Sequence, residues 1–404
     1  MINPFDDLCD WLLDQTLSDH DMSTTLKALT KKLIEIDVPL DRVSISRSLL
    51  HPTIGLFDMV WEREDDHVTI TKIPRHLVLD NMNLNTPFVD LAKGKVTRVF
   101  ADLTDPDEVT RYDNFPSLAA AGITAYVAFA RVFGLKHSLY FPIEADFRGA
   151  CVSVATKHPD GFTTEDLRGM TRLMPALCAC LRVDSERSLA EEILDIYLGR
   201  VSGKKILGGQ IELGDGQNLK CAIFYSDLRN SLGLSQQLER RAYLDTLNAY
   251  FDCTATSVQE HGGEVLKFIG DGILAIFPFD DDENSRPEMC AAALASAQDA
   301  FVRAERLSTQ RQNEGLPDIE FGVALHLGEV IYGNVGTQHR LDFTATGPAV
   351  GLASRIEGLT RELDYSILGT REFATQIEHQ GDDLGPHDIR GFDTPISLVG
   401  FPIG

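Results

Sequence analysis

Two aspartates lie where the sequence would place the ends of neighbouring strands. Asp227 directly follows the apolar run 221–226, and Asp271 lies in a Gly-Asp-Gly turn between the apolar runs 265–269 and 273–277. If these strands share a sheet, the two carboxylates meet at one edge. Paired carboxylates with open coordination positions suit Mg²⁺ or Mn²⁺ held together with the phosphates of a substrate. Each aspartate alone is explained by its position, Asp227 at the end of a strand and Asp271 in a turn. The two aspartates together predict a metal site.

A lysine interrupts the first of the two apolar runs around the turn. Lys267 lies four residues before Asp271, within Val-Leu-Lys-Phe-Ile. Such a lysine can simply extend its ammonium group from a strand into water while its stem packs. Taken together with the two aspartates, it favours a functional site over these structural explanations.

The residues after Asp227 lead from a strand into a helix. The first N–H groups of a helix have no partner within the helix and bind phosphates well. We therefore expect this segment to contact the substrate through Leu228, Arg229, Asn230 and Ser231.

The elements that must position these residues follow a recognisable order. From residue 220 onward we expect a strand (221–226), a helix (235–260), the hairpin (265–277), a helix (287–307) and a strand (319–336). This βαββαβ order predicts a ferredoxin-like sheet that contains antiparallel strands and carries its helices on one face.

The first half of the chain predicts a separate α+β domain. Helical spacing covers residues 25–36, strand patterns cover 67–73, 125–133, 137–143 and 150–156, and a second helix covers 163–181. Thr163 and Asp166 have the spacing of an N-terminal capping box for that helix. This order resembles a GAF-type sensor domain in pattern, and the resemblance implies a small-molecule ligand for it.

Residues 184–200 predict a helix between the two domains. Leu189, Ile193 and Ile196 recur at steps of four and three, as in a packed helix or a short coiled coil. Packing on its own domain and dimer formation explain this stripe equally well. We expect the domains to span residues 1–183 and 206–404, with a helical signalling linker over 184–205.

Composition limits the possible partners. The 61 acidic residues exceed the 37 basic ones, and the net charge of −24 opposes binding to nucleic acid or to an anionic membrane. The seven cysteines include no Cys-x-x-Cys pair, and no apolar run reaches the length of a membrane span. These features predict a cytoplasmic protein without a membrane span.

Four segments resemble class III nucleotide cyclases in order and spacing. They read IFYSDLRNS, GGEVLKFIGDGILAIF, VALHLGEVIYGNVG and RLDFTATGPAVGLASRIEG, and the resemblance covers residues 220–401. It implies two metal ions, Mg²⁺ or Mn²⁺, on Asp227 and Asp271. It also implies that Lys267 and Thr344 bind the purine, and a donor lysine there favours ATP over GTP.

The same resemblance implies an adenylate cyclase reaction. The ribose 3′-hydroxyl of ATP attacks the α-phosphorus, which gives 3′,5′-cyclic AMP and pyrophosphate. Arg355 would stabilise charge on the α-phosphate, and Arg390 would bind the terminal phosphates. In homodimeric relatives the site lies at a head-to-tail interface, with the metal aspartates and Lys267 from one chain and Arg355 from the other.

Two positions depart from the family pattern. Asn230 and Ser231 stand where relatives carry an aromatic-containing turn, and Gly351 stands where relatives carry an asparagine that orients the ribose. Gly347 and Pro348 predict a helix start, which would place Gly351 and Arg355 one turn apart. These departures keep open an alternative function, namely a weakly active or inactive cyclase-like module that binds nucleotide and regulates a partner.

Overall fold

The computed structural model divides the chain into two compact units, Met1–Ile193 and Leu194–Gly404. It describes residues 3–18, 20–48, 53–81, 84–133, 149–280, 285–377 and 381–403. No helix in these ranges is both long and apolar enough to cross a bilayer.

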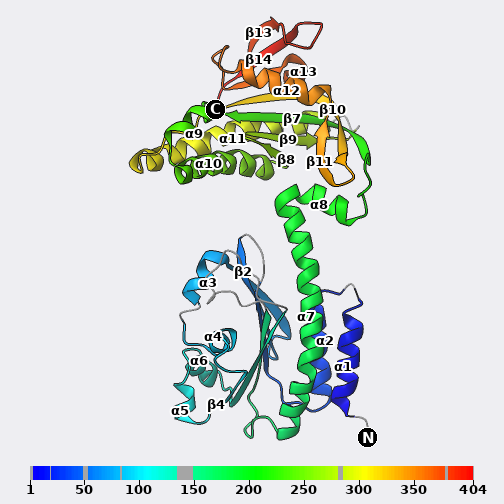
Figure 1. Cartoon of the computed structure of the whole chain (residues 1–404), viewed down its shortest axis with the longest axis vertical. Coiled ribbons are helices and arrows are strands. Elements are labelled where there is room, and N and C mark those ends of the chain that lie inside the picture. Colours follow the sequence, from blue (N-terminus) through cyan, green and yellow to red (C-terminus); the bar gives the residue numbers. More distant parts are fainter. Residues whose placement is uncertain are drawn as a thin grey trace. The chain divides into compact units, whose positions relative to one another are not determined.

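The first unit is built around one antiparallel sheet in the order β3-β2-β1-β6-β5-β4 (Figure 1). Its strands are β1 (Arg42–Ser48), β2 (Ile54–Glu62), β3 (His67–Pro74), β4 (Arg98–Asp102), β5 (Ala125–Val132) and β6 (Gly149–Thr156). Its helices are α1 (Pro4–Gln15), α2 (Met22–Glu35), α3 (Arg75–Asn81), α4 (Pro87–Ala92), α5 (Pro106–Val109), α6 (Phe115–Ala120) and α7 (Thr164–Leu198). The expected strand at residues 137–143 lies outside the described residues.

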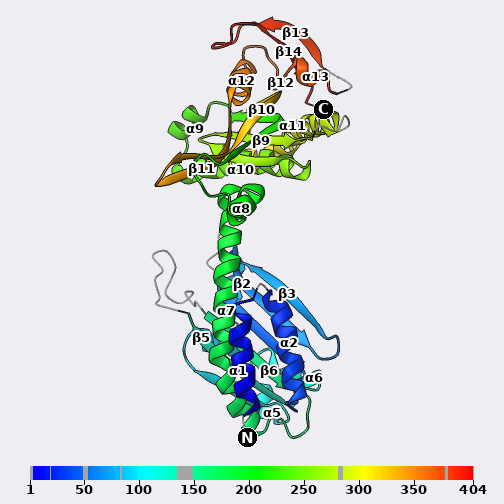
Figure 2. The same ribbon diagram turned by 90° about the vertical axis from the view of Figure 1, so that its right-hand side faces the viewer.

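Helices cover both faces of this sheet (Figure 2). The larger core joins α1, α2 and α7 to inward-facing strand residues such as Ile45 and Val127. A smaller core joins α4 and α6 to Tyr126, Ala128 and other residues of the opposite face. Because successive side chains of a strand point to opposite faces of the sheet, each face packs against its own apolar core.

The predicted capping box begins α7. The Thr163 N–H donates to the Asp166 carboxylate at 2.8 Å, and the Asp166 N–H donates to Thr163 Oγ1 at 3.1 Å. The helix then continues without a break through Pro175 to Leu198. The helix expected over 163–181 and the helix expected over 184–200 are therefore parts of one element.

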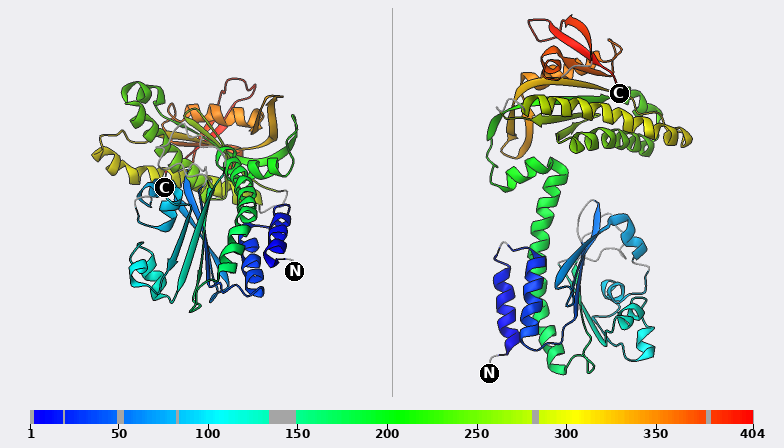
Figure 3. Two further views of the ribbon diagram at one scale, coloured as in Figure 1. Left: turned by 60° about the horizontal axis from the view of Figure 1, so that its bottom comes forward. Right: turned by 180° about the vertical axis from the view of Figure 1, so that it is seen from behind.

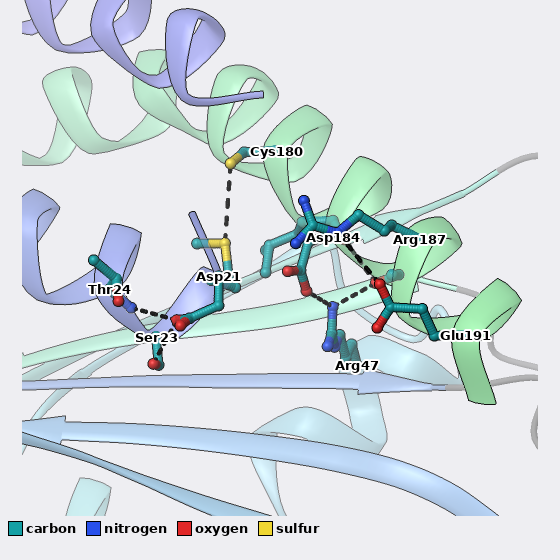
Figure 4. A network of polar contacts seen from close by, with 11 residues as sticks. Asp21, Ser23, Thr24, Arg47, Cys180, Asp184, Arg187 and Glu191 are labelled. Carbon is teal, nitrogen blue, oxygen red and sulfur yellow. Dashed lines mark hydrogen bonds and ion pairs between the residues drawn. The ribbon is translucent and has the colours of Figure 1, made fainter. Parts of the chain in front are cut away.

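A buried ion pair fastens α7 to the end of β1 (Figure 4). Arg47 is 3% exposed, and its Nη1 donates to Asp184 Oδ2 at 2.5 Å and to Ser185 Oγ at 2.8 Å. The guanidinium group also lies over the ring of Phe57, 4.5 Å from its centroid. This contact joins residues that are 137 positions apart in the sequence.

The second unit has an eight-stranded sheet in the order β13-β14-β12-β10-β7-β9-β8, with β11 paired to β10. Figure 3 shows this unit from two further sides, with the C-terminal strands in red. Its strands are β7 (Gly216–Leu228), β8 (Glu264–Ile269), β9 (Gly272–Pro278), β10 (Phe321–Thr337), β11 (Arg340–Thr346), β12 (Ile367–Thr370), β13 (Asp382–His387) and β14 (Ile396–Phe401). Its helices are α8 (Arg200–Leu207), α9 (Ser231–Gln237), α10 (Arg240–Glu260), α11 (Ser285–Asn313), α12 (Pro348–Leu359) and α13 (Arg371–Ala374).

The predicted βαββαβ order is present, but two details of the prediction are wrong. Helices cover both faces of the sheet, because α12 packs against Cys221 and Ile223 while α10 and α11 pack against Ala222 and Phe224. The helix expected over 235–260 is interrupted where Leu238 and Glu239 adopt extended backbone, so that Glu239 is the N-cap residue of α10.

Helix α8 is bonded to the sheet of its own unit through a buried tyrosine. Ser202 Oγ lies 2.8 Å from the hydroxyl of Tyr332, which donates to the carboxylate of Glu264 at 2.6 Å. Lys205 lies over the Tyr332 ring, 4.5 Å from its centroid. The start of β8 is thereby connected to the helix that precedes the sheet.

Candidate active site

The end of β7 and the β8–β9 turn bring the two predicted metal ligands together. Asp227 pairs with Gly272 across β7 and β9, and the Leu228 N–H donates to the carbonyl oxygen of Asp271 at 3.1 Å. Ile269 pairs with Gly272, so Gly270 and Asp271 form a two-residue turn. The positive φ of 65° falls on Gly270 rather than on the aspartate. The glycine thus allows the turn that presents Asp271.

The electrostatics of this pair fit a bound cation. Burial, followed by the neighbouring Asp271 carboxylate, raises the pKa of Asp227 to about 6. Asp227 Oδ1 is buried and has no hydrogen-bond partner among the described residues. A divalent cation would satisfy this oxygen and remove the repulsion between the two carboxylates.

The number of protein ligands also fits magnesium or manganese. Within the described ranges, no three His, Cys, Asp or Glu side chains lie close enough to bind one ion together. Mg²⁺ is commonly bound by one or two carboxylates, with water and substrate phosphates in its other positions. Asp227 and Asp271 match that arrangement.

A third carboxylate lies near the pair, which the sequence analysis missed. Burial, followed by Asp227, raises the pKa of Glu357 to about 7, and Arg229 and Arg361 act in the opposite direction. Glu357 lies on α12 with Ala349 and Ala353 at intervals of four residues, so it belongs to the stripe that faces the sheet. The signal available in the sequence was a glutamate in a helix stripe whose other residues, Ala349 and Ala353, are small and apolar.

Lys267 lies beside an acidic residue of β11. Its Nζ donates to Asp342 Oδ2 at 2.5 Å. Thr344 lies two residues further along β11, on the same face as Asp342, and is 8% exposed. No hydrogen bond between Lys267 and Thr344 is found in the described part of the chain. Sequence reasoning did not find Asp342, because the contact spans 75 positions.

Arg355 lies on α12 next to residues that face β7. Ser354 bonds to Tyr225 and Glu357 lies near Asp227, so one side of α12 faces β7. Arg355 is exposed and makes no ion pair with any residue that the structure describes. As predicted, Gly347 is the N-cap and Pro348 the first residue of α12. Gly351 is exposed one turn before Arg355.

The remaining predicted residues lie in two separate places, the connection from β7 to α9 and the turn between β13 and β14. Asn230, with a positive φ of 57°, precedes α9, and the Ser231 hydroxyl lies 3.1 Å from that of Tyr243. The Arg229 N–H donates to the Glu320 carbonyl at 2.8 Å, and Leu228 is buried in the core. Arg390 is exposed in a turn between β13 and β14. The structure brings neither Arg355 nor Arg390 to the Asp227–Asp271 pair of the same chain.

Part of the second unit matches a known protein family. Residues 216–380 match the family described as adenylate and guanylate cyclase catalytic domain. An adenylate cyclase of Anabaena cylindrica is 38% identical over 168 residues, which cover 41% of this chain and 32% of that protein. The terminal-differentiation-specific adenylate cyclase of Dictyostelium discoideum is 36% identical over 163 residues, which cover 40% of this chain and 7% of that protein.

Among solved structures, the adenylyl cyclase CyaB of P. aeruginosa is 27% identical. The match covers 46% of this chain and 95% of that structure, with a TM-score of 0.40. The chain spans only about a third or less of the two curated relatives named above.

Proposed function

Residues 216–380 form a class III nucleotide cyclase catalytic domain that is homologous to bacterial adenylate cyclases, and from this premise we propose that the chain converts ATP to 3′,5′-cyclic AMP and pyrophosphate. The observation that carries the proposal is the Asp227–Asp271 pair. The turn is tied to the end of β7, and an oxygen of Asp227 is buried without a partner.

The chain's own residues supply charge and position rather than covalent chemistry. Asp227 and Asp271 would hold Mg²⁺ or Mn²⁺, two ions per site. When bound, such ions activate the ribose 3′-oxygen and neutralise charge on the triphosphate. Arg355 stabilises the charge that develops on the α-phosphate, and Arg390 binds the terminal phosphates. Within residues 228–231, the backbone of Asn230 and Ser231 would face the phosphates, because the N–H groups of Leu228 and Arg229 donate to carbonyl oxygens of the chain.

Lys267 and Thr344 would select adenine. An ammonium donor suits the acceptor nitrogen of the adenine ring, and Asp342 holds that ammonium group in place. A site built to hydrogen-bond one base rejects a base that leaves its buried polar groups unpaired. ATP is therefore the preferred substrate.

The complete site would require two copies of the chain. Arg355 is exposed on α12, while Ser354 and Glu357 on either side of it face β7 of the same chain. A head-to-tail homodimer would bring Arg355 of one copy to the carboxylate pair of the other. Two-fold symmetry then gives two equivalent sites.

The first unit would regulate this reaction. Helix α7 packs in the core of that unit and continues to Leu198, two residues before α8. Ser202 of α8 is linked through Tyr332 to Glu264, which lies three residues before Lys267 on β8. A change that a ligand of the first unit causes in α7 can be transmitted to the purine-binding strand by this route.

Product analysis tests the proposal. The purified chain is incubated with ATP or GTP and Mn²⁺, the products are separated by chromatography, and Asp227→Ala serves as the inactive control. Cyclic AMP made from ATP, with much less cyclic GMP from GTP, supports the assignment. A preference for GTP would overturn the role of Lys267. Nucleotide binding without either product would favour the inactive regulatory module instead.

A further inference from the structure

Helix α12 lies unusually close to β10 at two glycines. At one end, a Cβ atom on Gly328 would lie 2.5 Å from the Cβ of Ala349. At the other end, a Cβ atom on Gly322 would lie 2.4 Å from Glu357 Oε1 and 2.4 Å from Thr360 Oγ1. All three distances are far shorter than real contacts of Cβ atoms. A side chain at Gly328 would therefore force the helix or the strand to shift, and one at Gly322 would displace the carboxyl group of Glu357. The carboxyl group of Glu357 thus occupies the space of the missing side chain at Gly322.

That space is directly beside the first metal ligand. Gly322 and Asp227 are paired across β10 and β7. Paired residues of antiparallel strands direct their side chains to the same face, with Cβ positions about 5 Å apart. Glu357 therefore takes the position of a cross-strand neighbour of Asp227, although it belongs to a helix.

The charges in this cluster do not balance without a cation. Asp227 exerts the largest electrostatic effect on Glu357, followed by the opposing Arg229 and Arg361 and then by Asp271. Tyr225, on the same strand face as Asp227, is also within the field of the three carboxylates. An ion pair between Glu357 and either arginine, with a nitrogen–oxygen distance of 4.0 Å or less, is not found among the described residues. The two arginines thus offset the charge of Glu357 without pairing with it, and Asp227 remains its strongest charged neighbour.

We propose that Glu357 is a positioning residue of the metal site, which holds Asp227 in its ion-binding orientation and strengthens the attraction of the site for a divalent cation. This inference rests on the proposed function, because it assumes that Asp227 binds the cation. Glu357 does not join Asp227 and Asp271 as a third ligand, since no group of three His, Cys, Asp or Glu side chains among the described residues could hold one ion. Its effect is exerted through the position of Asp227 and through charge at a distance of about 5 Å.

Two different substitutions disturb this arrangement. Glu357→Gln removes the negative charge but keeps the size of the side chain. Gly322→Ala keeps the charge but places a methyl group where the carboxyl group now lies. Each has a matched control on or just after α12: Glu362→Gln changes an exposed glutamate, and Gly358→Ala adds a methyl group where nothing lies within 4 Å.

Direct Mn²⁺ binding is the readout, because it does not depend on turnover. Free Mn²⁺ is measured by electron paramagnetic resonance during titration of the full chain without nucleotide, and circular dichroism checks that each variant is folded. We expect Glu357→Gln and Gly322→Ala each to raise the dissociation constant for Mn²⁺ about tenfold. Both controls should bind as the wild type does. A merely structural role for Glu357 would leave Mn²⁺ affinity unchanged in a folded Glu357→Gln protein.

The outcomes separate this inference from the function on which it rests. If Asp227→Ala loses Mn²⁺ binding but Glu357→Gln and Gly322→Ala keep wild-type affinity, the role of Glu357 is overturned and the metal site stands. If the wild type binds Mn²⁺ no better than Asp227→Ala, the metal assignment itself fails, and the role of Glu357 fails with it.

Discussion

The ammonium group of Lys267 lies 2.5 Å from the carboxylate of Asp342, and this pair fixes the direction of the lysine on β8. We expect Asp342→Asn to lower kcat/KM for ATP about tenfold, chiefly through KM, because Lys267 loses its anchor. Stability should change by less than about 1 kcal/mol, since both side chains are partly exposed.

A double-mutant cycle distinguishes this role from a general effect on the strand. If Asp342 acts through Lys267, then adding Asp342→Asn to Lys267→Met should cause no further loss in steady-state assays with ATP. Independent, additive losses would show that the two residues do not work as a pair.

The double substitution Lys267→Glu and Thr344→Cys should reduce ATP turnover and permit some use of GTP.

The raised pKa of Asp227 predicts how the metal-free protein responds to pH. The pKa is about 6 in the folded state and about 3.9 in the unfolded state. The folded state therefore binds the proton more tightly, and its stability falls as pH rises from about 4 to about 6. Asp227→Asn removes this loss, so in EDTA the variant should unfold at a higher temperature than the wild type at pH 7.5.

The expected gain for Asp227→Asn is about 1 kcal/mol after allowance for solvent screening. Thermal unfolding, followed by circular dichroism in EDTA at pH 7.5 and at pH 4, measures this gain. The difference should shrink at pH 4, where the wild-type carboxyl group is protonated, and it should reverse when Mn²⁺ replaces EDTA. A constant difference across this range would contradict the assignment of the shift to Asp227.

Gly351 leaves an open position beside Arg355. A side chain there meets nothing within 4 Å, and Gly351 is an exposed residue inside α12. Gly351→Asn should raise the turnover number, since a polar group placed at a charge-developing centre is typically worth on the order of 10² to 10³ in rate. Apparent ATP affinity should change little, because the contact belongs mainly to the transition state. Equal or lower cyclic AMP formation at saturating ATP would mean that another group already orients the ribose.

The buried pair of Arg47 and Asp184 should dominate the stability of the first unit. Arg47→Met leaves a largely buried carboxylate without its partner, and we expect a loss of about 3 to 5 kcal/mol. Arg182→Met removes an exposed arginine of the same helix and should cost about 0.5 kcal/mol or less. Urea unfolding followed by tryptophan fluorescence measures this unit alone, because Trp11 and Trp61 are the only tryptophans of the chain. Equal midpoints for both variants would show that the pair does not hold α7.

Local patterns were sufficient to predict that Asp227 and Asp271 lie close together, whereas contacts between distant parts of the chain could not be read from them. Asp227 and Asp271 each lie at the end of a strand that alternation and turn residues define, so short windows of sequence located them. Asp342 and Glu357 depend on which strand or helix packs beside them, and that is set by contacts across 75 or more positions.

The same distinction explains the errors in the predicted elements. Periodicity predicted helical residues over 235–260 but could not show the extended backbone at Leu238 and Glu239, where no proline or glycine marks the break. The order of elements predicted the βαββαβ core, but it did not indicate that α12 covers the second face. That face is determined by close approach at Gly322 and Gly328.

Complementation between two inactive chains tests most directly the central claim that two copies share each active site. Asp227→Ala and Arg355→Ala chains, each inactive alone, are purified with different affinity tags and mixed, and cyclic AMP formation from ATP and Mn²⁺ is measured. One site of each mixed dimer then carries intact carboxylates from one copy and Arg355 from the other, so random exchange should restore about one quarter of wild-type turnover. If co-purification shows mixed dimers and the mixture still makes no cyclic AMP, the shared site is contradicted.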